Sequence, residues 1–291
     1  MKRKHIKNII VSIASILGAV MIAILVHAFI PSPGAALNSD DFNSLLVKTF
    51  GFPVVASSYF ILLYLHIVII LLYFGSKTNI NTKKIGLRFG TAFALIYFMG
   101  MQEVVVEASP FTSWGFDFVM YQFFMGLGDA IPVFILCIVI TVSILKKKEN
   151  KITCKVQFCK YRLLHVVTIA FAFFLERTIG YIVGYIDSDI EHYPIPVLIW
   201  TALFGLVYGI AFILLYPIYF NKKNTFISSL NSSVFTLGIN WIIFNSFIGM
   251  IYTDTILQAI LRSGVDVIVI FIVIIFLNKY HQNLMRLNLI H

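Results

Sequence analysis

The chain has 291 residues, of which 59% are apolar and only 12% are charged, and its mean hydropathy is +0.92. So few polar residues exclude a soluble globular protein. The apolar runs are about 20 residues long, which is the length of a membrane-spanning helix rather than of a strand. The composition therefore predicts an all-α, polytopic transmembrane helix bundle whose partner is the lipid bilayer.

Eight apolar runs are predicted to span the membrane. The first, from about residue 9 to residue 30, is followed by Pro31, Pro33 and Gly34, which cannot continue a helix. This run is too long for the apolar region of a secretory signal, so we favour an uncleaved span, although 34–36 (Gly-Ala-Ala) leaves cleavage open. The other predicted spans cover about residues 53–74, 89–106, 118–145, 163–186, 196–220, 234–252 and 256–277.

The basic residues predict the orientation of the chain. All but three of the 22 Lys and Arg residues fall in connections on one side of the predicted spans, whereas the other side has Lys48 alone. Because cytoplasmic loops carry the excess of Lys and Arg, both termini are expected in the cytoplasm. The net charge of +9 follows from this topology, so no nucleic-acid partner is expected. The composition, rich in Lys, Ile and Asn, favours the plasma membrane of a prokaryote.

Two segments suggest a 4+4 parallel internal repeat. Pro53-Val54 opens the second predicted span as Pro196-Val197 opens the sixth, and the fourth and eighth spans align with Asp129 and Asp266 one position apart. Since four is an even number, the halves would be parallel and related by an axis along the membrane normal. The alternative is a chance resemblance of apolar segments. The repeat would divide the chain into residues 1–150 and 151–291.

Charged residues inside the predicted spans are the candidates for a functional site. Asp129 and Asp266 fall near the midplane, where an ionised carboxylate costs about 2.5 kcal/mol or more and therefore needs a partner. Arg262 precedes Asp266 by four positions, so a local pair is expected. Arg177 is then expected to serve Asp129, Glu176 or Glu103. The candidates for ligand or ion binding are Asp129, Asp266, Glu176, Arg177, Glu103, Arg262 and His66.

The fourth predicted span carries two glycines before a proline. Gly126, Gly128 and Pro132 predict a kink or an unwound turn beside Asp129, as in the discontinuous helices of many transporters. A kinked helix that serves only packing is the commoner alternative. His66, in the middle of the second span, is expected either to hydrogen-bond to a neighbouring helix or to relay protons.

Motifs for soluble catalysis are missing from the sequence. It has no phosphate-binding Gly-Lys loop, no His-Glu-x-x-His motif and no Gly-x-Ser-x-Gly motif. The three cysteines lack the partners of a zinc site. No cofactor and no metal are therefore expected, and a function other than catalysis is favoured.

Three functions fit these observations. A small-molecule or ion carrier, coupled to protons or cations at an acidic site near the midplane, is preferred. The first alternative is a membrane accessory, sensor or immunity protein whose buried charges only tie helices together. The second is an intramembrane lipid-modifying enzyme that uses a carboxylate with His66. The carrier hypothesis requires Asp129 and Asp266 on inward faces around a polar cavity, whereas the enzyme hypothesis requires His66 within hydrogen-bond reach of a carboxylate.

Overall fold

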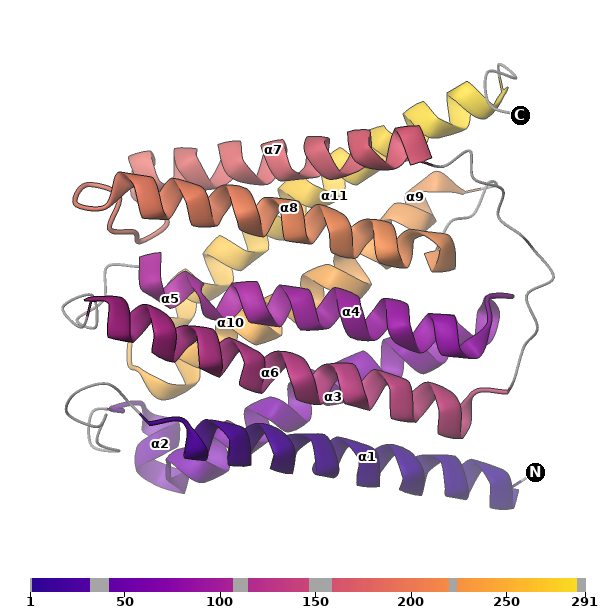
Figure 1. Ribbon diagram of the computed structural model, residues 1–291, viewed down its shortest axis with the longest axis horizontal. Coiled ribbons are helices and arrows are strands. Elements are labelled where there is room, and N and C mark those ends of the chain that lie inside the picture. The colour runs from indigo at the N-terminus through magenta and orange to yellow at the C-terminus, as the bar shows by residue number, and fades with distance from the viewer. Residues whose placement is uncertain (1, 32–41, 107–114, 147–158, 220–223, 287–291) are drawn as a thin grey trace.

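The computed structural model describes residues 2–31, 42–106, 115–146, 159–219 and 224–286, and within them it contains helices and no strand (Figure 1). The possible cleavage segment at residues 34–36 lies outside these ranges. The short helices are α2 (Leu45–Phe50), α5 (Glu103–Val106) and α9 (Thr225–Ser229), and a π-helix, η4 (Leu230–Gly238), follows α9 directly. The other helices are α1 (Lys2–Phe29), α3 (Phe52–Lys77), α4 (Thr82–Met101), α6 (Gly115–Ile144), α7 (Cys159–Val183), α8 (Pro194–Tyr219), α10 (Ile239–Ile251) and α11 (Ile256–Arg286).

Seven helices of the described ranges are long and apolar enough to cross a membrane. They are α1, α3, α6, α7, α8, α11 and the continuous helix that α9, η4 and α10 form together. The remaining predicted span, residues 89–106, falls on α4 and α5, which are separated at Gln102. Lys83, Lys84 and Arg88 lie in the first two turns of α4 and shorten its apolar stretch. The structure is thus consistent with a multi-pass membrane protein with seven clear spans. Whether the described chain has seven or eight spans depends on whether α4 also crosses the membrane.

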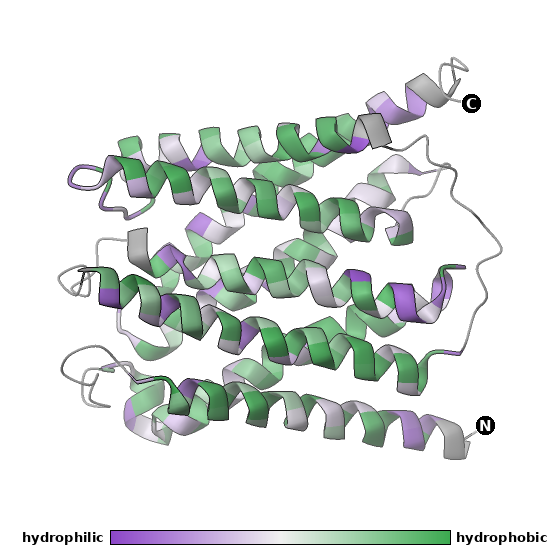
Figure 2. Cartoon of the chain, viewed as in Figure 1, coloured by the Kyte–Doolittle hydropathy of each residue, from purple (hydrophilic) through white to green (hydrophobic). Residues whose placement is uncertain are grey.

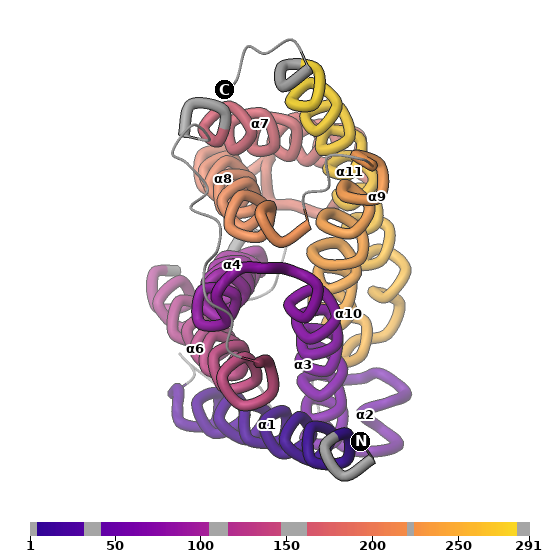
Figure 3. Tube along the Cα trace, turned by 90° about the vertical axis from the view of Figure 1, so that its right-hand side faces the viewer, coloured from indigo at the N-terminus to yellow at the C-terminus, as the bar shows by residue number. Residues whose placement is uncertain are grey.

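The long helices close into a ring. Helix α1 packs on α3 and α6, α6 on α4, α4 on α8, α8 on α7, α7 on α11, α11 on α10, and α10 on α3. Figure 3, which looks along the helices, shows α6, α4, α8 and α7 on one side, α3, α10 and α11 on the other, and α1 closing the ring. Apolar and aromatic side chains fill the interior, among them Tyr64, Phe93, Phe204 and Trp241. Polar residues are buried among them, and the charged ones in this set are Glu103, Asp129, Glu176, Arg177, Arg262 and Asp266.

The helices run back and forth along a common axis, so that α1 begins and α11 ends at the same end of the bundle (Figure 1). Figure 2 shows hydrophobic residues along most of α1, α6, α7 and α8. We call the end where α1 begins the basic end, and the other the acidic end. The basic end carries Lys7, Lys77, Lys83, Lys84, Lys146 and Lys279, and the acidic end Asp117, Asp187, Asp189, Glu191 and Asp254.

Helix α6 runs without interruption from Gly115 to Ile144 with Pro132 inside it, so the predicted unwound turn is wrong. The two glycines serve close packing instead. A Cβ atom on Gly126 would lie 2.8 Å from the carbonyl oxygen of Phe98 in α4, and one on Gly128 would lie 3.1 Å from the ring of His27 in α1. An added Cβ at Gly126 would meet backbone, whereas one at Gly128 would require side chains of α1 to shift by a few tenths of an ångström, so both glycines favour the close packing of α4 and α1 on α6.

The irregular backbone lies in the seventh predicted span, where the sequence did not suggest it. That span was expected from about residue 234, but the helix begins at Thr225 and passes through η4. Buried Ser and Thr hydroxyls donate to carbonyl oxygens of the preceding turn throughout this stretch, and Thr236 donates to the carbonyl oxygen of Asn231, five residues earlier. Such bonds compete with the regular helical pattern, which explains the wider turns.

Candidate functional site

Arg177 of α7 is fully buried at the centre of the larger of two ionic sites. Its Nε and Nη2 atoms donate to the two carboxylate oxygens of Asp266 in α11, at 2.7 and 2.6 Å. Its Nη1 atom donates to Glu103 of α5 at 2.5 Å. A bidentate Arg–carboxylate pair is among the strongest polar contacts in proteins. Arg177 therefore ties α5, α7 and α11 together. We use the name Arg177 cluster for a set of six side chains: Arg177, Asp266, Glu103, Glu176, Trp241 and Arg262.

Two further residues complete the contacts of Asp266 and Glu103. The indole nitrogen of Trp241 in α10 donates to Asp266 at 2.8 Å. Arg262 donates to Asn245 at 3.1 Å and lies 3.6 Å from Glu103. Arg262, which its spacing suggested as the partner of Asp266, thus contacts Asn245 and Glu103. Although Arg262 and Asp266 share one helical face, Arg177 takes both oxygens of Asp266 from across the bundle.

Glu176 occupies the edge of the cluster. One of its oxygens accepts a hydrogen bond from the hydroxyl of Tyr185 at 2.6 Å, and the other lies 4.0 Å from Nε of Arg177. Glu176 is also within electrostatic range of Asp266. With Glu103, the cluster holds three acids against two arginines, so a full set of ionised side chains would leave one negative charge in excess.

His27 and Asp129 form the second ionic site. Nε2 of His27 in α1 lies 3.3 Å from Oδ1 of Asp129 in α6, whose side chain is only 5% exposed. Of the three acids expected to pair with Arg177, Glu103 is bonded to it, whereas Asp129 is not, because Arg177 is engaged by Glu103 and Asp266 on the other side of the ring. Asp129 and Asp266 thus belong to separate sites. Sequence reasoning missed His27 because it counted only arginines as partners inside the spans.

The geometry of His27 places a single proton between the two side chains. Nδ1 of His27 lies 2.7 Å from the carbonyl oxygen of Ala23, one turn earlier, which can only accept. Nδ1 therefore carries a hydrogen, and Nε2 of a neutral ring is an acceptor that faces an acceptor on Asp129. One additional proton, on Nε2 or on the carboxylate, is needed to make the contact attractive. The pair can hold or release that proton, whereas Arg177 is always charged.

Polar atoms around Asp129 are less well satisfied than those of the Arg177 cluster. Oδ1 of Asp129 and the hydroxyl of Tyr64 in α3 are both buried, and neither has a hydrogen-bond partner within the described part of the chain. The two side chains are close enough to interact electrostatically. A buried polar atom without a partner is costly unless something else supplies the bond. Asp129 and Tyr64 therefore offer an acceptor and a hydroxyl that could serve a proton, a cation or a polar solute.

A cavity of about 490 Å³ lies nearer the acidic end of the bundle than the His27–Asp129 pair does. The residues after His27, from Phe29 to Pro31, form one wall, and the first turns of α6 form the other, with Asp117 and Tyr121. Asp129 is two turns further along the same helix. Neither His27 nor Asp129 lines this cavity, but its two walls belong to the segments that carry them.

His66 lies in a different chain of hydrogen bonds. Its Nε2 atom is 3.0 Å from the carbonyl oxygen of Phe235 in η4, and the amide of Asn240 donates to its Nδ1 atom at 3.3 Å. The hydroxyl of Tyr97 donates to the other end of Asn240 at 2.8 Å. Both ring nitrogens are thus occupied by an amide and a backbone carbonyl, and among the described residues neither is paired with a carboxylate. This geometry does not favour the enzyme hypothesis.

The fold and the two ionic sites together define a multi-pass helical membrane protein with buried, paired charges. A comparison with protein-family models, with curated proteins and with solved structures found no match for this chain.

Proposed function

We propose that this protein is a carrier coupled to protons or cations, in which His27 and Asp129 form the coupling site. The observation that carries the proposal is the contrast between the two ionic sites. The Arg177 cluster is held by several short bonds to a group that is always charged. The His27–Asp129 pair has one 3.3 Å contact and a proton that either partner can hold, and a cavity lies between the end of α1 and the first turns of α6, the two helices that carry the pair. Ionisable residues inside membrane spans commonly form proton and ion pathways.

The proposal includes eight membrane crossings with both termini in the cytoplasm of a prokaryotic cell. Helix α4 lies along the same axis as its neighbours and packs between α6 and α8, so protein rather than lipid covers much of its surface. Arg88, near its basic end, donates to the carbonyl oxygen of Leu214 in α8 at 2.7 Å, which satisfies part of its charge. A helix covered in this way needs fewer apolar residues to cross.

Cysteine labelling distinguishes eight crossings from seven. In a background with Cys137, Cys154 and Cys159 replaced by serine, we expect Ser188→Cys to react with an impermeant maleimide in intact cells. Asn79→Cys should react only after the membrane is opened. If α4 did not cross, both positions would lie on the same side and would label alike, which would refute the eight-span topology.

The order of helices in the ring supports an internal duplication. If α1, α3, α4 and α6 correspond to α7, α8, α10 and α11, every neighbour in the ring maps onto a neighbour: α1 with α6 onto α7 with α11, and α4 with α8 onto α10 with α3. The two halves run in the same direction. This is the arrangement expected of parallel repeats related by an axis along the membrane normal.

Side chains of corresponding helices support the same relation. Buried Gln122, Val133 and Cys137 of α6 fall at a constant spacing from buried Ala259, Ile270 and Ile274 of α11, and this spacing superimposes Asp129 on Asp266. The sequence alignment, which set the two aspartates one position apart, is shifted by one residue from this register. In the same way, Ala19 and Ala23 of α1 correspond to Ile169 and Phe173 of α7, and His27 then corresponds to Arg177. Under this correspondence the two ionic sites would occupy equivalent places.

The duplication gives the two sites different roles in the proposed carrier. Each half has a cation on its first helix and an aspartate on its fourth. In the second half, a permanently charged arginine makes the pair a fixed tie. In the first half, a histidine makes it a site that changes its charge with a single proton. We infer that the second half is the rigid frame against which α1 and α6 respond to that proton.

Proton movement in reconstituted vesicles tests the proposal. Vesicles with a trapped pH-sensitive dye are given sodium, potassium, and a panel of amino acids and sugars, under pH gradients of both polarities. We expect at least one of these solutes to drive proton flux, and Asp129→Asn to reduce that flux at least about 100-fold, since a proton-transfer group typically contributes this much or more. Asp187→Asn, which removes an exposed acid at the acidic end, should transport like the parent. Absence of flux with every solute, or full flux in Asp129→Asn, would refute the proposal.

The accessory function is the second candidate. It is favoured by the Arg177 cluster, where Asp266, Glu103 and Arg177 are bonded to one another and are almost completely buried. Such a cluster needs no ligand to explain its charges. A carrier and an accessory protein thus differ at the His27–Asp129 pair, because only the carrier needs its proton.

A further inference from the structure

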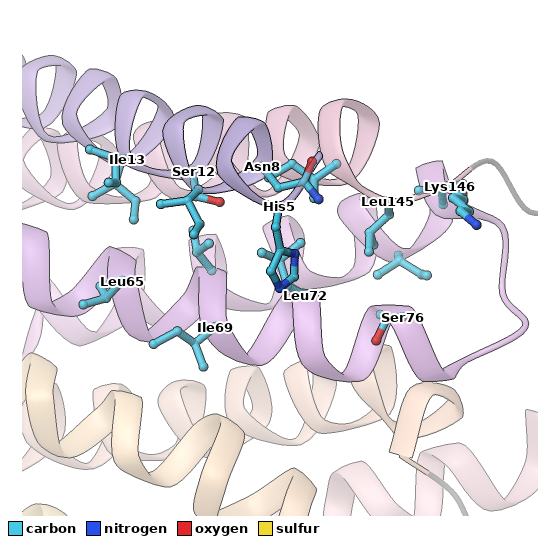
Figure 4. Close-up of a pocket in the computed structure, with 17 residues that line it drawn as sticks. His5, Asn8, Ser12, Ile13, Leu65, Ile69, Leu72, Ser76, Leu145 and Lys146 are labelled. Carbon is cyan, nitrogen blue, oxygen red and sulfur yellow. The ribbon is translucent and has the colours of Figure 1, made fainter. Parts of the chain in front are cut away.

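A cavity of about 750 Å³ opens between α1, α3 and the end of α6, toward the basic end of the bundle (Figure 4). It is separate from the ionic sites, since neither His27 nor Asp129 lines it. Large apolar side chains on both walls are exposed: Ile9 and Ile13 of α1 by 55% and 53%, and Leu65 and Ile69 of α3 by 41% and 56%. A cavity of this size is large enough for a ligand.

The cavity exists because α1 does not close onto α3 as α7 closes onto α8. Gly205 and Gly209 of α8 let α7 approach so closely that an added Cβ on either would lie 2.8 Å from a carbonyl oxygen of α7. The wall of the cavity on α3 carries larger side chains, among them Val68 and Leu72. The second half thus lacks the space that makes the cavity.

The lining changes from apolar to polar along the helices. Figure 4 shows Ile13, Leu65 and Ile69 at one end of the cavity, and Ser76 and Lys146 at the other. Asn8 and His5 line the part between them. Lys146 carries a positive charge, and no acidic residue is among the lining side chains of the described chain. Lys77, Lys83 and Lys84 lie at the same end of the bundle. The polar end therefore complements a negatively charged group.

We infer that this cavity binds an acyl chain of an anionic phospholipid, with the phosphate headgroup at Lys146, His5 and Asn8. Helix α1 has the smallest buried share of the seven clear spans, so the cavity beside it borders the lipid rather than the interior of the bundle. Basic pockets between spanning helices on the cytoplasmic side are known to bind anionic headgroups. The site rests on its own lining and does not depend on the carrier proposal.

Lipid binding to the purified full-length protein tests this inference. Native mass spectrometry in detergent would compare dioleoylphosphatidylglycerol with dioleoylphosphatidylcholine. We expect the parent to retain one anionic lipid per chain in preference to the zwitterionic one. Lys146→Gln should lower that preference about fivefold, since a basic residue near the membrane surface contributes about 1 kcal/mol to the binding of an anionic lipid. Lys279→Gln, at the same end but outside the cavity, should leave the preference unchanged.

Filling the apolar part gives an independent measurement. Ser12→Trp from α1 and Ile69→Trp from α3 each place a bulky side chain in the cavity, so either variant should lose the bound lipid. Leu164→Trp, on the exposed face of α7, is the matched control and should retain it. The inference would be overturned if the parent bound both lipids equally or bound neither. Retention by both folded tryptophan variants, or a dimer of the parent that buries this face and leaves no room for the lipid, would also overturn it.

Discussion

Arg177→Met is expected to lower the free energy of unfolding by about 3 to 5 kcal/mol, the cost of breaking a buried ion pair by removing one partner. Methionine fills much of the volume of arginine but donates no hydrogen bond. Asp266 would lose two bonds and Glu103 one, while both carboxylates stayed buried. The penalty therefore comes mainly from the acids left behind, which would have to take up protons or draw water into the bundle.

Thermal unfolding in detergent, followed by the reaction of buried Cys137 with a thiol reagent, measures this effect. Lys279→Met, which removes an exposed cation from α11, is the control and should unfold like the parent. The double variant Arg177→Met with Asp266→Asn should be less destabilised than the sum of the two single variants, because the second change removes a charge that the first left unpaired. Additive effects would contradict the pairing of Arg177 with Asp266.

Gly205→Leu is expected to produce the second large effect, by separating α7 from α8. The Cβ atom would lie 2.8 Å from the carbonyl oxygen of Ala170 and 3.1 Å from its Cα atom, and backbone atoms cannot rotate away as a side chain can. Overpacking of a close contact typically costs about 1 to 3 kcal/mol. Because α7 carries Arg177, we expect the shift also to disturb the ionic cluster, so the loss should lie at the upper end of that range.

The same thermal unfolding assay measures the glycine variant. Gly18→Leu is the matched control, since an added Cβ there has no atom within 4 Å and the position is exposed. It should unfold close to the parent. If Gly205→Leu were also neutral, the close contact of α7 and α8 would not be a major contributor to stability, and the account of why α1 stays apart from α3 would lose its basis.

Much of the fold follows from local features of the sequence. The ends of most helices agree with the predicted spans within several residues, because hydropathy and the prolines after α1 act over a single segment. Local sequence is less informative where a helix is covered by protein. Helix α4 begins earlier than predicted and includes Lys83 and Lys84, and η4 has no simple signature beyond its run of Ser and Thr.

The pairing of charges could not be predicted from spacing alone. The four-residue spacing of Arg262 and Asp266 indicated a local pair, but Arg177, 89 positions away from Asp266, has the better geometry. Two contacts explain why Asp266 pairs with Arg177. Arg177 reaches both oxygens of Asp266 at once, and Trp241 holds the same carboxylate from another helix. Spacing along one helix cannot show which neighbour lies across from it.

The sequence by itself determined the class of protein and the small set of charged residues that a membrane interior must accommodate. These follow from the cost of placing polar groups in lipid, which depends on the residue and not on its neighbours. Only the tertiary structure decided that Asp266 is held by Arg177 whereas Asp129 faces His27. Those contacts join helices that are far apart in sequence, and they depend on close approaches such as that of Gly128 to His27. Packing therefore separated a fixed ionic tie from a site that can exchange a proton.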